Sequence, residues 1–226
     1  MEYFLHIDTS AETCTVALSA DGIPRAHQLN TDTRSQAANI NRMIAEVLAE
    51  EGIALSRLSG VAVCAGPGSY TGLRVSMATA KAICYVNNIP LFAQNKLTLM
   101  AHQAINQYPE YESYIAVLIA REQEYFVAAY NRDLTEQVAP VHMPEADLPE
   151  MLNGDKNILI IGNIHQETVN SLAGSEIRIL PVEILDLESW SKFTYNQFKC
   201  NESVNLASAE PFYLKQVYTH NSKKNK

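Results

Sequence analysis

The sequence predicts an α/β protein of two lobes, the second a degenerate version of the first. Short apolar runs of strand length alternate with longer segments of helical periodicity, which is the pattern of an α/β fold. Hairpin signals come first and crossover helices follow, so the first sheet is expected to be mixed. The segment Gln107–Tyr111 indicates a boundary, after which a patchier pattern begins.

The first lobe opens with strands and continues with helices that connect parallel strands. Three strands are expected at the start, at Tyr3–Thr9, Thr13–Ser19 and Pro24–Asn30. Asp21-Gly22 is a hairpin signal. A helix is expected from Thr33 or Ser35 to about Glu51, because apolar residues recur there at helical spacing. The remaining elements are a buried strand at Val61–Ala65, a helix at Leu73–Val86, a strand at Ile89–Gln94 and a helix at Lys96–Asn106.

This order of elements is that of the ribonuclease-H-like half-domain used by actin, hexokinase and the Hsp70-type ATPases. We expect a first lobe at residues 1–107 and a smaller second lobe at 108–226, ending in a frayed basic tail at Asn221–Lys226. The strands expected in the second lobe are Tyr114–Ala120, Glu124–Asn131, Ile158–Ile161 and Ile177–Leu180. The helices expected there are Ala146–Leu152, Ile164–Ala173 and Val182–Lys199.

Composition limits the classes of function. The chain has 226 residues, of which 47% are hydrophobic, and a formal net charge of −8. An acidic chain repels polyphosphate, so contact with RNA is expected only through a partner. No apolar run reaches membrane-spanning length, and the N-terminus predicts a strand rather than a signal peptide. The four cysteines form no CxxC pair, which favours reduced thiols and the cytoplasm.

The densest signal is a glycine-rich turn, Gly66–Gly72, between a buried strand and a helix. Such a turn aims backbone N–H groups at an anion or at a close-packed neighbour. Phosphate binding is disfavoured, because Pro67 removes a donor and no lysine follows the glycines. The residues that could face a nucleotide are Asp8, Thr9, Gly66, Gly68 and Ser69. Asp8 could equally cap the turn after the first strand, and we favour that role.

The helix at Leu73–Val86 lacks the polar stripe expected opposite a sheet. It is either a central helix of its own domain or a helix that also packs on another protein. In the second case it would form a partner surface with the helix before it. The residues expected on that surface are Ile40, Met43, Ile44, Val47, Met77, Ala80, Lys81 and Cys84. An Ala80→Arg substitution would then abolish pairing and leave the monomer folded.

Four stretches resemble the bacterial TsaB (YeaZ) family: IDTS at 7–10, AGPGSYTGLRVSMATAKA at 65–82, IPLFAQNKL at 89–97 and EPFYLKQ at 210–216. The resemblance implies the two-lobed actin-like fold and a role in forming threonylcarbamoyladenosine, beside the anticodon of tRNAs that read codons starting with A. It implies a non-catalytic subunit that pairs with the catalytic paralogue TsaD, is joined by the ATPase TsaE, and forms homodimers when alone.

The catalytic paralogues carry a His-x-x-x-His helix where this chain has Lys96 and Met100, which are poor metal ligands. We therefore expect no catalytic residue, no metal site, no peptidase activity and no cofactor held tightly by this chain alone. ATP or ADP at the partner interface stays open. Ile119 and Gln123 depart from the family's Asp-Ala-Arg-x-Gly-Glu pattern. The alternative is a nucleotide-dependent ATPase or phosphotransferase that uses Asp8 and the glycine turn.

Overall fold

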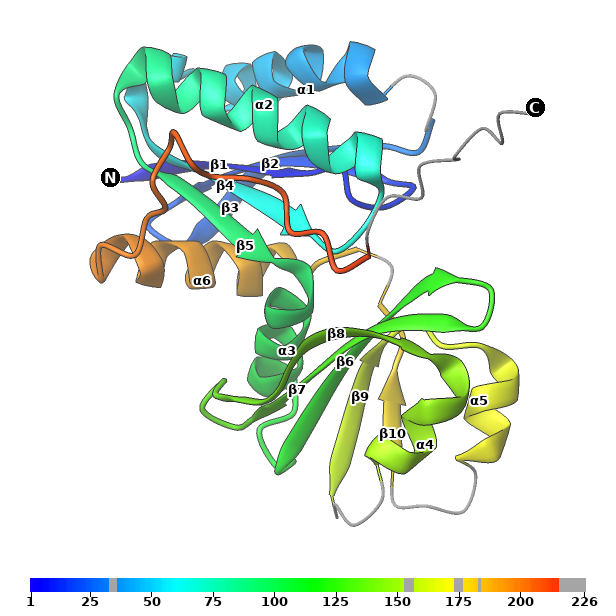
Figure 1. Cartoon of the computed structure of the whole chain (residues 1–226). Helices are drawn as coiled ribbons and strands as arrows, with labels where there is room; N and C mark the ends of the chain where they lie inside the picture. The colour runs from blue at the N-terminus through cyan, green and yellow to red at the C-terminus, as the bar shows by residue number, and fades with distance from the viewer. Residues whose placement is uncertain (33–35, 153–156, 173–176, 183, 216–226) are drawn as a thin grey trace, which may run out of the picture.

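The alternating apolar runs form two five-stranded sheets, one in each lobe (Figure 1). The computed structural model describes residues 1–32, 36–152, 157–172, 177–182 and 184–215. Several predicted features therefore lie outside the described residues: a helix start at Thr33 or Ser35, a helix end at Ala173, the last residue of the EPFYLKQ stretch and the basic tail.

The first sheet has the strand order β3-β2-β1-β4-β5. Its strands are β1 (Tyr3–Asp8), β2 (Cys14–Ala20), β3 (Ile23–Asn30), β4 (Leu58–Gly66) and β5 (Leu91–Asn95). Strand β1 pairs antiparallel with β2 and parallel with β4, so the sheet is mixed as expected. A 3₁₀ turn, η1 (Leu55–Arg57), leads into β4.

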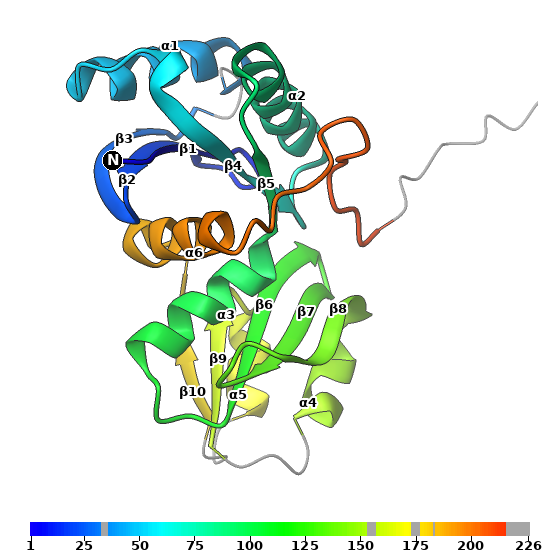
Figure 2. The same cartoon turned by 90° about the vertical axis from the view of Figure 1, so that its left-hand side faces the viewer.

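Helices cover both faces of this sheet, which explains why β1, β2 and β4 are buried along nearly their whole length. Helices α1 (Gln36–Glu50) and α2 (Tyr70–Asn87) lie on one face, and α6 (Leu187–Lys199) lies on the other (Figure 1, Figure 2). Leu5 and Ile7 of β1 belong to the core under α1 and α2. Phe4 and His6, which alternate with them, contact Phe198 and Trp190 of α6.

The second sheet repeats this plan, with the order β10-β9-β6-β7-β8. Its strands are β6 (Ser113–Arg121), β7 (Glu124–Asn131), β8 (Glu136–Pro144), β9 (Ile158–Gly162) and β10 (Ile177–Leu180). The central strand β6 pairs antiparallel with β7 and parallel with β9, as β1 does with β2 and β4. The helices η2 (Glu145–Asp147), α4 (Leu148–Met151) and α5 (Gln166–Ser171) are short. The second lobe is thus a reduced copy of the first.

Two helices cross the boundary that we expected at residue 107. Helix α3 (Lys96–Gln107) was assigned to the first lobe, but its apolar side packs against the second sheet. Helix α6 was assigned to the second lobe, but it packs under the first sheet and carries the chain back to it. A division by sequence alone misplaces both helices, because each buries its apolar face on the other side of the boundary.

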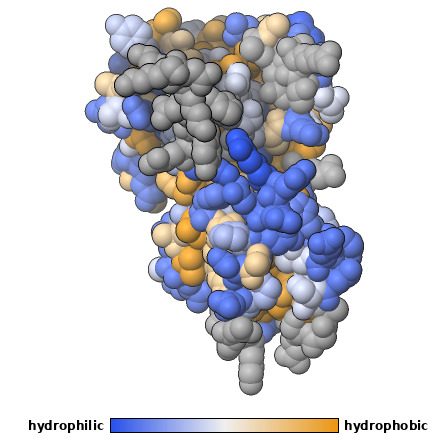
Figure 3. Space-filling view, turned by 45° about the vertical axis from the view of Figure 1, so that its right-hand side comes forward, coloured by the Kyte–Doolittle hydropathy of each residue, from blue (hydrophilic) through white to orange (hydrophobic). Residues whose placement is uncertain are grey.

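Sequence reasoning also missed β8. Its two prolines and its partly exposed side chains weaken the strand signal, because prolines are tolerated chiefly on edge strands. Strand β8 is indeed the edge of the second sheet. In the view of Figure 3 the molecule narrows where the lobes meet, and the surface there is largely hydrophilic. Among the described helices, none combines the length and apolar character needed to cross a membrane.

Candidate functional site

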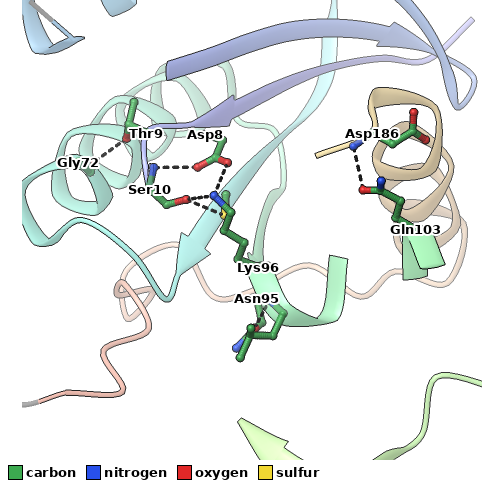
Figure 4. A network of polar contacts seen from close by, with 10 residues as sticks. Asp8, Thr9, Ser10, Gly72, Asn95, Lys96, Gln103 and Asp186 are labelled. Carbon is green, nitrogen blue, oxygen red and sulfur yellow. Dashed lines mark hydrogen bonds and ion pairs between the residues drawn. The ribbon is translucent and has the colours of Figure 1, made fainter. Parts of the chain in front are cut away.

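A buried ion pair lies where the end of β1 meets the start of α3 (Figure 4). Lys96 Nζ is 3.3 Å from Asp8 Oδ2 and donates a 2.8 Å hydrogen bond to Ser10 Oγ. Asp8 Oδ1 accepts the backbone N–H of Ser10 at 2.8 Å, which is the turn-capping role that we favoured. The Asp8 carboxylate is therefore occupied on both oxygens by groups of this chain.

Because both side chains are buried, each charge of this pair depends on the other for its compensation. The side chains of Lys96 and Asp8 are 6% and 7% exposed. Burial alone would lower the pKa of Lys96, but the nearby Asp8 carboxylate outweighs it, and the pKa is raised above its ordinary value. The Cys64 thiol donates toward Ser10 Oγ at 3.6 Å. Its pKa is raised to about 12 by burial and by Asp8, so it is a neutral thiol near neutral pH.

The glycine turn is packed against the end of β1. A Cβ on Gly68 would overlap the backbone of Ser10, and one on Gly72 would overlap the carbonyl oxygen of Thr9. The Thr9 hydroxyl donates to the Gly72 carbonyl at 2.6 Å. The glycines therefore permit close approach of two backbones, which is one of the two roles that the sequence left open.

Two backbone donors of the turn are also used internally. The Ser69 N–H donates to the Ser10 carbonyl at 2.8 Å, and the Ser69 hydroxyl accepts the Gly72 N–H to cap α2. Gly66 is buried at the end of β4. Asp8 and Thr9 are buried too, 5% and 0% exposed. Of the five residues expected to face a nucleotide, only Gly68 and Ser69 are exposed.

An actin-like fold implies nucleotide binding, and these contacts determine whether a phosphate has space and free donors between β1 and the glycine turn. A phosphate held between the end of β1 and the glycine turn would need the space that Ser10 and Gly68 share. It would also need free donors, whereas the Ser69 N–H and the Lys96 ammonium already have acceptors. The residues present do not fit a phosphate or its magnesium ion at this position.

The two positions that carry histidines in the catalytic paralogues are both buried here. Lys96 is held by Asp8 and Ser10, and Met100 lies in the apolar cluster between α3 and the second sheet. Within the part of the chain that the structure describes, no group of three His, Cys, Asp or Glu residues is placed to hold a metal ion.

The structure does not present the predicted partner residues as an exposed surface. Seven of the eight are buried in the first lobe's own core, at 0–4% exposure: Ile40, Met43, Ile44, Val47, Met77, Ala80 and Cys84. The eighth, Lys81, is half-buried and donates to the carbonyls of Ala207 and Ala209. The error is one of helix phase, because the most apolar stripe of each helix packs on its own sheet. Ala80→Arg would place a guanidinium in this core and unfold the monomer.

The outer face of α2 carries apolar residues, as the lack of a polar stripe in its sequence predicted. Ala78 and Ala82 are exposed, and Tyr85 and Val86 are each 80% exposed. Beside them a groove of about 520 Å³ lies between α1 and α2. Its lining is Asn41, Ile44, Ala45, Leu48, Ala49, Ile53, Leu55 and Ile83. This face is apolar and lies on the side of the lobe opposite α6 (Figure 2).

Sequence reasoning missed a cleft of about 420 Å³ between the lobes. Ser10 and the glycine turn line one side, Ile119 and Arg121 line the other, and residues 212–215 close it. Tyr70 and Tyr213 pack their rings 5.1 Å apart at its edge. The aromatic residues of the EPFYLKQ stretch were the available signal, since an aromatic pair in a polar terminal segment suggests docking.

Comparison with known proteins agrees with this geometry. The model of the family described as TsaD, tRNA N6-adenosine threonylcarbamoyltransferase, matches residues 30–167. The tRNA threonylcarbamoyladenosine biosynthesis protein TsaB of Haemophilus influenzae is 29% identical, over 95% of this chain and 94% of that protein. The structure of YeaZ from Pseudomonas aeruginosa superposes with a TM-score of 0.77 at 23% identity, over 95% of this chain and all of that one, 100%.

A more distant structure shows the fold alone. The activator of 2-hydroxyisocaproyl-CoA dehydratase from Clostridium difficile, solved with bound ADPNP, superposes with a TM-score of 0.52 at 9% identity, over 89% of this chain and 96% of that one. The two-lobed actin-like architecture expected from the order of elements is confirmed. Because the family model spans more than half of the chain and the TsaB relative nearly all of it, the chain belongs to the TsaD family and, within it, to the TsaB (YeaZ) group.

Proposed function

We propose that this chain is a non-catalytic subunit in the formation of threonylcarbamoyladenosine in tRNA, and that it holds a catalytic paralogue of the TsaD type. The observation that carries the proposal is the Asp8–Ser10–Lys96 cluster. It fills, with groups of this chain, the place where an actin-like ATPase would hold phosphate and metal. A protein with that place filled contributes by association rather than by phosphate chemistry.

The surface for association is the outer face of α1 and α2. Ala82, Tyr85 and Val86 of α2 are exposed apolar residues, and Ile83 of the same helix lines the groove between these helices. A pair of helices that meets a similar pair forms a four-helix interface. Such an interface is self-complementary in a homodimer and nearly so with a paralogue, so one face would serve both kinds of pairing. A TsaE-type ATPase would then join the complex, and tRNA would contact it through the catalytic paralogue.

The test places an arginine on this face without touching the core. Ala82→Arg changes an exposed position of α2, whereas Gln166→Arg makes a matched change on exposed α5 of the other lobe. A central interface position costs about 2 kcal/mol or more when disrupted, which is a roughly 30-fold weaker complex. We expect Ala82→Arg to lose co-purification with the catalytic paralogue and Gln166→Arg to keep it, both with parental circular dichroism. Full pairing by Ala82→Arg would show that the face is wrong.

The alternative, an ATPase or phosphotransferase that uses Asp8 and the glycine turn, is tested on the isolated chain. Calorimetry with ATP and Mg²⁺ should give no tight binding, and the chain should release no phosphate. Tight binding with turnover would favour the enzyme. A tRNA modification assay with the catalytic paralogue, run with and without this chain, should show product only when the chain is present.

A further inference from the structure

The last described segment of the chain, residues 201–215, runs as an extended strap from α6 back to the junction of the lobes. We call it the C-terminal strap. In Figures 1 and 2 it leaves α6, passes beside β5 and α2, and ends where the two lobes meet. It is the third segment, after α3 and α6, that belongs to one half of the sequence and contacts the other half of the fold.

The strap is held to the first lobe at several points. The Val204 N–H donates to Leu91 O at 2.9 Å, and the Phe212 N–H donates to Ala65 O at 2.7 Å. Lys81 Nζ donates to the carbonyls of two strap residues between them, at 3.2 and 3.0 Å. These bonds follow the exposed edge of β5 and the side of α2. The strap therefore moves with the first lobe.

A further anchor lies near the end of the strap. Arg74 Nε donates to Tyr213 Oη at 3.1 Å, and its guanidinium lies 4.0 Å from the centre of the Tyr70 ring. The Tyr70 and Tyr213 rings pack together, so the three side chains form one stack at the N-terminal end of α2. This stack carries the strap up to the mouth of the cleft between the lobes.

Contact with the second lobe is made by the last two described residues. Lys215 Nζ forms an ion pair with Glu124 at the start of β7. Glu124 also lies 3.1 Å from His142 Nε2 of β8. The hydrogen bond from Lys215, followed by the contact with His142, lowers the pKa of Glu124. Leu214 packs beside this pair against the apolar cluster between the lobes.

The cleft connects these two sets of contacts. Strap residues 212–215 form one wall of it, and Ile119 and Arg121 of the second lobe form another. The width of the cleft thus depends on where the second lobe meets the end of the strap. The attachment is asymmetric among the described residues: backbone and side-chain bonds hold the strap to the first lobe, whereas the partly exposed Lys215–Glu124 ion pair and the packing of Leu214 hold its end to the second.

We propose that the C-terminal strap is a latch that sets the opening between the lobes, with the Lys215–Glu124 pair as its releasable end. When the pair breaks, the strap stays on the first lobe and the second lobe gains freedom to swing about α3. When the pair forms, the cleft is closed to the width seen in the structure. The strap then acts as a conformational device built into the fold, independent of whether α1 and α2 bind a partner.

The distance between the lobes tests this directly. Spin labels are attached at Ser56→Cys in η1 and Glu167→Cys in α5, both exposed, in a Cys200→Ser background, since Cys200 is the exposed native cysteine. Electron–electron double resonance then measures the distance distribution in the full chain, diluted with unlabelled protein to suppress signals between copies. Lys192→Ala, which removes an exposed ion pair within α6, is the control.

We expect a narrow distribution in the parent, in the Lys192→Ala control and in Lys215→Arg, which keeps the charge. Lys215→Ala should broaden the distribution, and Lys215→Glu, which opposes Glu124, should shift it further toward long distances. Unchanged distributions in both variants would overturn the proposal. So would a Lys215→Arg distribution as broad as that of Lys215→Ala, because the charge would then not be what holds the latch. Circular dichroism of each variant confirms that it is folded.

Discussion

Replacing Lys96 with methionine tests the buried ion pair between Lys96 and Asp8. The substitution removes the ammonium and leaves the Asp8 carboxylate, 7% exposed, with the Ser10 N–H as its one remaining hydrogen-bond donor among the described residues. Breaking a buried pair by deleting one partner costs about 3–5 kcal/mol, because an uncompensated charge stays buried. For a chain of this size, each kcal/mol lowers Tm by roughly 2–4 °C. We therefore expect Tm to fall by roughly 6–20 °C.

The assay is urea denaturation followed by far-UV circular dichroism, with thermal melts in parallel. Two variants sharpen it. Asp8→Asn combined with Lys96→Met removes both charges and should recover part of the loss, and the double-mutant cycle gives the coupling between the two side chains. Lys192→Met removes an exposed pair, 57% and 68% exposed, and should change stability by less than about 1 kcal/mol. Lys96→Met within about 1 kcal/mol of the parent would refute the assignment of Lys96 as the counter-charge of Asp8.

Two further predictions concern buried groups. His6 is 1% exposed, and burial lowers its pKa from 6.5 to about 3. Between pH 6.5 and about 3 the unfolded chain therefore binds a proton at His6 that the native state does not bind. As the pH falls through this range, the free energy of unfolding decreases by about 5 kcal/mol because of this residue. His6→Gln should remove that part of the pH dependence in urea titrations, and an unchanged profile would contradict the assignment. Gly72→Ala should cost about 3 kcal/mol, because its methyl group would overlap the Thr9 carbonyl; Thr71→Ala, at an exposed neighbour, should melt like the parent.

Patterns within a single element were predictable from the sequence. The run around Val61 is a buried strand because both faces of the first sheet are covered, and a strand covered on both faces is apolar throughout. The capping of the first turn by Asp8 was likewise predictable, since an Asp side chain reaches the N–H two residues on. The signals of β8 and of the latch residue Lys215 were not visible, because neither residue composition nor periodicity marks an edge strand or a long-range ion pair.

The partner surface shows the limit most clearly. The sequence showed that α2 has apolar residues on nearly every side. It does not show which of Ala80 and Ala82 faces the sheet, because that depends on how the helix packs. Packing decides between them: Ala80 is 0% exposed, and Ala82 faces outward. The phase of a helix is a property of its contacts, which composition cannot supply.

By itself, then, the sequence determined the mixed α/β plan of the first lobe and the absence of a phosphate-binding lysine after the glycine turn, and it predicted a degenerate second lobe. These depend on local propensity, periodicity and spacing, which act over a few residues. Only the tertiary structure decided that Lys96 meets Asp8, that α3 and α6 exchange sides, and that the strap ends on Glu124. Each of these joins residues about 90 or more positions apart or packs a helix across the boundary, and such contacts arise from the burial of apolar faces and the pairing of buried charges.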